Sequence, residues 1–272
     1  MVFLYYRNKM SDSRPIGIFD SGVGGVSVWK EVVKILPEES VVYYADSANC
    51  PYGAKKEHEI IELAQKNVDF LIEKQCKIIV VACNTATAAA IDFLRVKYKI
   101  PFIGMEPAIK PASLESKTKS IGVLATEGTF NGRLYRETTE RFAKDVNVNI
   151  KVGEKLVDIV ENGLIYDKET EKHLKKLIIP FIEKNIDHLV LGCTHYPFLM
   201  PVLEKILPSQ VKILDPAPAV AKQTYNILKK ENLLTPQNRG MSNYEFYTNG
   251  NIKVLNSFLK KITNQNYTLN QI

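Results

Sequence analysis

Short, almost continuous apolar runs recur along the chain, and each ends in small or polar residues. Four stretches show the order of strand, loop and helix, or its first part: residues 16–36 (IGIFDSGVGGVSVWKEVVKIL), 40–46 (SVVYYAD), 77–98 (KIIVVACNTATAAAIDFLRVKY) and 188–207 (HLVLGCTHYPFLMPVLEKIL). Strands that are apolar on both faces and alternate with helices are typical of a parallel sheet covered by helices on both sides. The pattern therefore predicts the α/β class.

Three short segments of the first half recur in the second half in the same order. IGIFDSGVGG from Ile16 is similar to IGVLATEGTF from Ile121, VVACNT around Cys83 is similar to VLGCTH around Cys193, and GMEPA is similar to ILDPA. The offsets lie between 105 and 110 residues, which favours a duplicated βα unit. The alternative is that any two α/β lobes share this order of strand, turn and helix.

We predict two pseudo-symmetric parallel-sheet lobes with the active site in the cleft between them. Proline-rich joints mark the crossings between lobes. The first lobe is expected to comprise residues 15–105 plus 216–272, because the last segment is too small to fold alone and returns to it. The second lobe is expected to comprise residues 106–215. Residues 1–14 form an N-terminal extension that is a candidate for disorder, and Met10 is an alternative start.

Charge and cysteine content argue against several classes of protein. The net charge of +6 is spread over scattered lysine pairs, so we expect no nucleic-acid partner. No apolar run reaches the roughly 18 residues of a membrane span. The four cysteines are irregularly spaced and form no CxxC pair, which argues against a disulfide scaffold and a metal site. Because no export signal is visible, we expect free thiols and a cytoplasmic location.

Polar groups follow the predicted strands at their carboxyl ends, where open α/β sheets bind ligands. These groups are Asp20-Ser21, Cys83-Asn84-Thr85, Thr126 and Cys193-Thr194-His195. If two related lobes face each other, each contributes one cysteine to the cleft.

Two opposed thiols suit the inversion of a carbon that carries a weakly acidic C–H. One base abstracts the proton and the other, protonated, donates from the opposite face, which is worth about 10²–10⁴ in rate. A helix N-terminus after each cysteine is expected to lower the thiol pKa. Cys50 and Cys76 are interpreted as small buried apolar side chains.

Asp20 and His195 are candidates for auxiliary groups, one near each thiol. The alternatives are that His195 caps or packs a helix and that Asp20, with Ser21, caps the next helix. The loop DSGVGG also has some character of a phosphate loop, although Ser27 replaces the third glycine of a dinucleotide fingerprint.

The motifs IGIFDSGVGG, YYADSANCPYG, ACNTATA and LGCTHYPFL together resemble the glutamate racemases, from about Ile16 to Asp215. The resemblance implies a cytoplasmic, dimeric, two-domain α/β enzyme that needs no cofactor and makes D-glutamate from L-glutamate for peptidoglycan. It implies that Cys83 and Cys193 are the two bases. It also implies a substrate-binding set of Asp20, Ser21, Tyr52, Gly53, Asn84, Thr85, Thr194 and His195.

Asp46 and Glu161 resemble further acidic residues near that family's active site. For Glu161, which precedes Asn162-Gly163, an exposed helical glutamate is the alternative, because its surroundings lack a proline often found in the family.

Other functions remain open from the residues alone. These are a related racemase for aspartate or hydantoins, a hydrolase with Cys193 as nucleophile and a histidine and aspartate beside it, and a two-lobed binder of acidic amino acids without catalysis.

Overall fold

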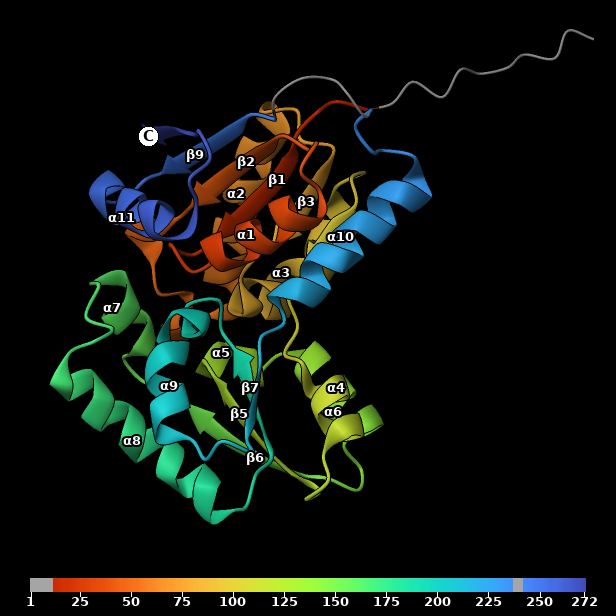
Figure 1. The fold of residues 1–272 in the computed structure, drawn as a ribbon. Coiled ribbons are helices and arrows are strands. Elements are labelled where there is room, and N and C mark those ends of the chain that lie inside the picture. The colour runs from red at the N-terminus through yellow and green to blue at the C-terminus, as the bar shows by residue number, and fades with distance from the viewer. Residues whose placement is uncertain (1–11, 237–241) are drawn as a thin grey trace, which may run out of the picture.

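The protein folds into two parallel sheets, each covered by helices, in a computed structural model that describes residues 12–236 and 242–272. The predicted α/β class with parallel sheets is confirmed. Figure 1 shows one sheet in the upper part of the molecule and the other in the lower part. Most of the predicted N-terminal extension, residues 1–11, lies outside the described residues. Within the described ranges, every helix is too short or too polar to cross a membrane.

The larger sheet has six strands in the order β10-β9-β2-β1-β3-β4. Its strands are β1 (Ile16–Asp20), β2 (Val41–Ala45), β3 (Ile78–Val81), β4 (Phe102–Gly104), β9 (Tyr244–Thr248) and β10 (Thr268–Gln271). Its helices and short 3₁₀ turns are α1 (Val26–Ile35), η1 (Ser47–Asn49), η2 (Tyr52–Ala54), α2 (Glu57–Glu73), α3 (Asn84–Lys97), α10 (Ala217–Glu231) and α11 (Ile252–Ile262).

The smaller sheet has four strands in the order β6-β5-β7-β8. Its strands are β5 (Ser120–Ala125), β6 (Asn147–Val152), β7 (His188–Gly192) and β8 (Lys212–Leu214). Its helices and 3₁₀ turn are α4 (Ile109–Glu115), α5 (Glu127–Phe130), α6 (Arg133–Phe142), α7 (Leu156–Glu161), α8 (Lys168–Glu183), η3 (Tyr196–Leu199) and α9 (Met200–Ile206).

The two sheets share one strand order, since β2-β1-β3-β4 in the first corresponds to β6-β5-β7-β8 in the second. The repeated sequence segments fall on β1 and β5, across the carboxyl ends of β3 and β7, and across the carboxyl ends of β4 and β8. The lobe boundaries drawn from the sequence stay a proposal, and the strands of each sheet fall within them.

Burial explains why the central strands are apolar throughout. Every residue of β1, β2, β3, β5 and β7 is buried, because successive side chains point to opposite faces and helices cover both. In the larger sheet, Ile16 and Ile18 face α1, α10 and α11, whereas Phe19 faces α2 and α3. The first of these apolar clusters continues into α7, α8 and α9 of the smaller sheet, so one core joins the two lobes.

The C-terminal segment completes the larger sheet. Strand β9 pairs in parallel with β2, and β10 pairs with β9. Trp29 of α1 packs edge-on against Tyr244 and Phe246 of β9, with ring centroids 5.5 and 5.1 Å apart. These contacts hold the C-terminal segment on the larger sheet, whose carboxyl edge faces the smaller sheet.

Candidate active site

The carboxyl ends of β1, β3, β5 and β7 meet at one narrow pocket between the two sheets. From the larger sheet, the predicted residues that line it are Ser21, Tyr52, Gly53, Cys83, Asn84 and Thr85. From the smaller sheet they are Cys193, Thr194 and His195. Pro51, Thr126 and Val157 complete the lining; Thr126 follows β5 as expected, whereas the sequence contained no signal for Val157.

Cys83 stands at the N-cap of α3, directly after the loop that leaves β3. Its Sγ accepts a weak hydrogen bond from the backbone N–H of Ala86, at 3.4 Å, and lies 3.8 Å from Oγ of Ser21. The predicted lowering of the thiol pKa is wrong for Cys83. Burial raises its pKa far above the ordinary value, and the nearby Asp20 carboxylate raises it further, so the helix N-terminus is outweighed. Cys83 is therefore a neutral thiol near pH 7.

Cys193 occupies the matching place after β7, and its side chain is also buried. Its Sγ lies 3.7 Å from Nδ1 of His195, within reach of a proton exchange. The two cysteines thus enter one pocket from equivalent strand ends of the two sheets, as the sequence predicted.

His195 is held between a sulfur and a carboxylate. Its Nε2 lies 2.6 Å from Oε1 of Glu161, on the opposite side of the ring from Cys193. Burial acts to lower the pKa of His195, but its hydrogen bonds to Cys193, Cys50 and Glu161 outweigh burial and raise it well above the ordinary value. The imidazole therefore carries its second proton over a wide pH range.

Glu161 ends α7 and crosses from the smaller sheet to the larger one. Its Oε1 accepts a hydrogen bond of 2.8 Å from the backbone N–H of Val23, in the loop after β1. Burial alone would raise the pKa of Glu161, yet the hydrogen bond to His195 and the charge of that ring lower it. Glu161 does not line the pocket but stands behind His195, and it is not an exposed helical glutamate.

Asp20 is completely buried at the end of β1 and connects the two lobes. Its Oδ2 accepts from the N–H of Gly25 at 2.8 Å and lies 3.3 Å from Oγ1 of Thr194. Burial raises the pKa of Asp20, while the charge on His195 opposes that rise. Asp20 therefore holds the loop before α1 without capping the helix, and it lies beside Thr194 rather than in the lining of the pocket.

The glycine loop before α1 packs closely against His195 and Thr194 and leaves no open site for a phosphate. A Cβ on Gly24 would lie 2.5 Å from Nδ1 of His195 and 2.6 Å from Oγ1 of Thr194. The loop DSGVGG thus allows the second lobe to approach β1, which argues against a phosphate loop.

Tyr52 and Asp46 form a buried pair at the rim of the pocket. The Tyr52 hydroxyl donates to Asp46 and accepts from Nδ2 of Asn67 at 3.1 Å. Asp46 also accepts from Asn49 at 2.8 Å and from Asn249 at 2.5 Å. Asp46 is absent from the pocket lining and fixes Tyr52, and with it the Tyr52-Gly53 turn, from behind.

Asn84 brings an unpaired polar atom to the pocket. Its Nδ2 donates to the carbonyl of Met105 at 3.4 Å, while its Oδ1 is buried without a hydrogen-bond partner. The hydroxyl of Thr85 instead forms a hydrogen bond to the hydroxyl of Thr126 in the other lobe, and the two Oγ1 atoms are 2.8 Å apart. An unpaired buried acceptor costs free energy, so Asn84 is a candidate to receive a donor from a ligand.

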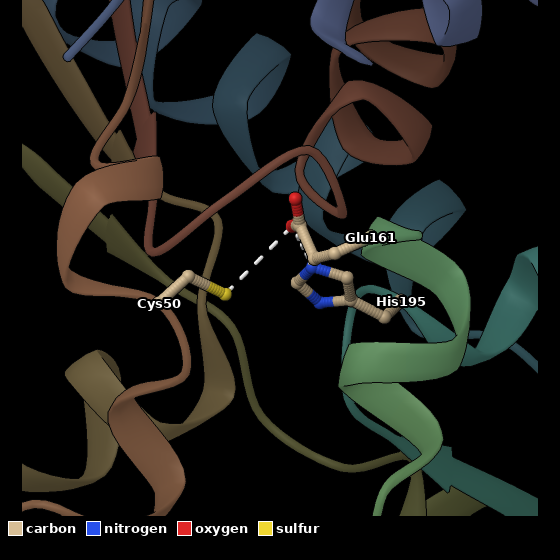
Figure 2. Close-up of side chains that lie close together, drawn as sticks. All are labelled: Cys50, Glu161 and His195. Atoms are coloured by element: carbon tan, nitrogen blue, oxygen red, sulfur yellow. Dashed lines mark hydrogen bonds and ion pairs between the residues drawn. The ribbon is translucent and has the colours of Figure 1, made fainter. Parts of the chain in front are cut away.

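Cys50 is a further residue, outside the pocket lining but next to it, that the sequence analysis missed. We interpreted it as an apolar side chain, but its Sγ lies 3.7 Å from Oε1 of Glu161, beside His195 (Figure 2). Only its place two residues before Tyr52 in NCPYG hinted at this position.

Comparisons with known proteins agree with this geometry. The sequence model of the Asp/Glu/Hydantoin racemase family matches residues 16–224. A glutamate racemase of Herpetosiphon aurantiacus is 41% identical over 237 residues, which cover 87% of this chain and 93% of that protein.

Two solved structures share the whole fold. The glutamate racemase of Francisella tularensis, in complex with D-glutamate, has a TM-score of 0.80 and 33% identity, covering 94% of this chain and 97% of that one. The Escherichia coli glutamate racemase, in complex with L-glutamate and the activator UDP-MurNAc-Ala, has a TM-score of 0.83 and 30% identity, covering 95% and 98%. The chain therefore belongs to the glutamate racemases of the Asp/Glu/hydantoin racemase family, isomerases that act on an amino acid.

Proposed function

We propose that this protein interconverts L-glutamate and D-glutamate without a cofactor, using Cys83 and Cys193 as bases on opposite faces of the α-carbon. The observation that carries this proposal is that both thiols line one pocket, each from the equivalent strand end of its own sheet. A single base would tend to return the proton to the face it came from, whereas two opposed bases invert the carbon.

The reaction needs one thiolate and one thiol at its start. In one direction, the Cys193 thiolate takes the proton from Cα, and the Cys83 thiol delivers its own proton to the opposite face of the carbanion. Burial keeps Cys83 protonated, which suits it to donate first. Nδ1 of His195 lies 3.7 Å from Sγ of Cys193, so the ring can exchange a proton with that sulfur. In the other direction the two sulfurs exchange roles, and no net proton is consumed.

The polar lining suits a small zwitterion with two carboxylates. The unpaired Oδ1 of Asn84 is a suitable acceptor for the substrate ammonium. The hydroxyls of Ser21, Thr85 and Thr194, together with backbone N–H groups at helix starts, are suitable donors to carboxylates. Two relatives bind D-glutamate and L-glutamate respectively, which supports glutamate over aspartate as the substrate.

The family suggests the setting of the enzyme. We propose that the D-glutamate serves peptidoglycan synthesis, that the enzyme works in the cytoplasm and that two copies form a homodimer. Size-exclusion chromatography with light scattering tests the last point, since a monomeric mass at assay concentration contradicts it.

The decisive experiment follows L-glutamate in D₂O, with no added cofactor, by optical rotation and by α-deuteration in the NMR spectrum. We expect rotation to decay to zero with deuterium at Cα in the wild type. Cys83→Ser and Cys193→Ser should each lose racemisation by at least about 10²-fold, the lower end of an acid–base contribution. Cys76→Ser, which changes a buried thiol outside the pocket, serves as the matched control.

Other outcomes identify the rival functions. Turnover of aspartate but not glutamate would assign the other substrate. Full activity of Cys83→Ser would contradict the two-base mechanism and favour Cys193 as a lone nucleophile. Binding of glutamate with no rotation change and no deuteration would make the protein a binder.

A further inference from the structure

Three side chains of different chemistry meet behind the pocket, on the side of His195 that faces away from Cys193. Sγ of Cys50, a carboxylate oxygen of Glu161 and a ring nitrogen of His195 all lie within 4.8 Å of one another. Figure 2 shows Cys50 on one side and the Glu161 carboxylate above the His195 ring on the other. Cys50 belongs to the larger-sheet lobe, whereas Glu161 and His195 belong to the smaller one.

The donor atoms match one class of cation. A sulfur, an imidazole nitrogen and a carboxylate oxygen together suit Zn²⁺ and similar borderline divalent ions. Ca²⁺ and Mg²⁺ prefer sets made of oxygen atoms. Three protein ligands also leave a fourth tetrahedral position for water or a small ligand.

The distances need little change to form such a centre. Zn–S bonds of about 2.3 Å and Zn–O bonds of about 2.0–2.2 Å place sulfur and oxygen roughly 3.5 Å apart in a tetrahedron. Sγ of Cys50 and Oε1 of Glu161 are 3.7 Å apart. Nε2 of His195 and Oε1 of Glu161 are 2.6 Å apart as a hydrogen-bonded pair, so they must separate by somewhat under about 1 Å.

The surroundings hold the three ligands in place. The N–H of Val23 donates to the Glu161 carboxylate, the kind of outer hydrogen bond that orients metal ligands. Gly22 makes room for the side chains of Glu161 and Cys50, because a Cβ at this position would lie 2.0 Å from the Glu161 oxygen and 3.0 Å from the Cys50 sulfur. The Nδ1 side of His195 stays directed at Cys193, so Nε2 is the nitrogen that faces this cluster.

We propose that Cys50, Glu161 and His195 form a binding site for Zn²⁺ or a similar thiophilic divalent cation. Coordination replaces the proton on Cys50 Sγ and the proton on His195 Nε2, and both protons pass to solvent. The cation then links the two lobes and removes His195 from proton exchange with Cys193. This departs from the sequence prediction of no metal site, which was based on the irregular spacing of the four cysteines.

Cobalt is the probe that tests binding without any activity assay. Chelator-treated wild-type protein is titrated with Co²⁺ and read by absorption, since a thiolate bound to Co²⁺ gives a near-ultraviolet charge-transfer band and tetrahedral coordination gives strong visible bands. We expect one equivalent to bind with both signals, and added Zn²⁺ to abolish them.

Single substitutions identify which cysteine supplies the thiolate that binds Co²⁺. Cys50→Ser should remove the charge-transfer band and weaken binding more than about tenfold, and Glu161→Gln should weaken it by about tenfold or more. Cys83→Ser and Cys76→Ser should keep the band, and circular dichroism should confirm that every variant is folded. No thiolate band in the wild type, or a band that survives Cys50→Ser, would overturn the proposed site.

A second measurement links the site to catalysis. Zn²⁺ should inhibit racemisation in the wild type, and Cys50→Ser should need at least about tenfold more Zn²⁺ for the same inhibition. Inhibition follows only if the proposed racemisation is right, whereas cobalt binding does not depend on it. A cobalt band in a protein without racemase activity would therefore support the metal site and reject the proposed function.

Discussion

Glu161 accepts a 2.6 Å hydrogen bond from Nε2 of His195, which leaves Nδ1 of the same ring directed at the Cys193 sulfur. The carboxylate is one of the causes that raise the pKa of His195. In Glu161→Gln, the His195 pKa should fall, because an amide gives no charge to stabilise the imidazolium. We expect the racemisation rate to drop roughly 10–10³-fold, part of an acid–base contribution of about 10²–10⁴.

The pH–rate profile distinguishes this effect from simple loss of structure. The protonated imidazole persists to higher pH in the wild type, so the alkaline limb of the Glu161→Gln profile should move to lower pH. The glutamine oxygen can still accept from Val23, which keeps the contact between lobes. Asp158→Asn, on the exposed side of the same helix, is the matched control. Unchanged limbs in Glu161→Gln would show that the carboxylate does not act through His195.

Asn84 should affect substrate binding more than the chemical step. Its Oδ1 is buried and unpaired in the free enzyme, so an ammonium group that pairs with it relieves a cost of about 1–3 kcal/mol. Asn84→Ala should therefore raise KM for glutamate roughly 5- to 100-fold and lower kcat less. Steady-state kinetics in both directions measure this. A variant with unchanged KM and reduced kcat would place the ammonium elsewhere.

A buried ion pair outside the pocket lining should make the larger lobe sensitive to the loss of one partner. Nζ of Lys77 lies 2.6 Å from Oε2 of Glu39, with side chains 0% and 2% exposed. Lys77→Met leaves the Glu39 charge buried and unpaired, which costs about 3–5 kcal/mol. Urea unfolding should show this loss. Adding Glu39→Leu to Lys77→Met should recover most of it, and failure to recover would mean that the hydrogen bonds from Thr235 to Glu39 carry the stability.

Low pH should reduce the free energy of unfolding of the smaller lobe, because Asp187 becomes protonated. Burial would raise its pKa, but hydrogen bonds from the N–H of Thr118, from His188, from Ser116 and from the N–H of Lys117 outweigh burial and hold the pKa well below its usual range. A lowered folded-state pKa stabilises the fold above the unfolded pKa of about 3.9, and this gain is lost as the pH falls below that value.

Asp187→Asn should thus cost roughly 1.5–3 kcal/mol at pH 7, the usual range for hydrogen bonds to a charged group. The difference from the wild type should shrink between pH 4 and the pKa of the folded protein. Urea titrations at pH 7 and at about pH 3 compare the two, with the exposed Asp145→Asn as control. A difference that stays constant with pH would contradict the role of the Asp187 charge.

The local pattern of the chain predicted the class of fold and the position of both thiols. Buried parallel strands read as apolar runs, and their carboxyl ends converge on one edge, so the positions of Cys83 and Cys193 follow from sequence. The repeated segments anticipated the shared strand order, because β5, β6, β7 and β8 reproduce β1, β2, β3 and β4.

Features that depend on packing between distant segments were harder to predict. Glu161 contacts Val23, 138 residues away, so its helix alone looked like an exposed one. Cys50 looked apolar for the same reason, since its partner Glu161 is 111 residues further along the chain. The helix N-terminus at Cys83 suggested a lowered pKa, but burial, which a local pattern does not measure, determines the direction.

The common strand order of the two sheets has a kinetic consequence for the proposed reaction. Mirror-image substrates have equal free energies in water, so the equilibrium constant for their exchange is one. The Haldane relation then requires kcat/KM to be the same for L- and D-glutamate, however unlike the two halves become. A substitution in the Glu161–His195 pair, or at Ser21 or Asp20, must therefore change kcat/KM by the same factor for L- and D-glutamate, whereas kcat and KM taken separately are free to differ between the two directions.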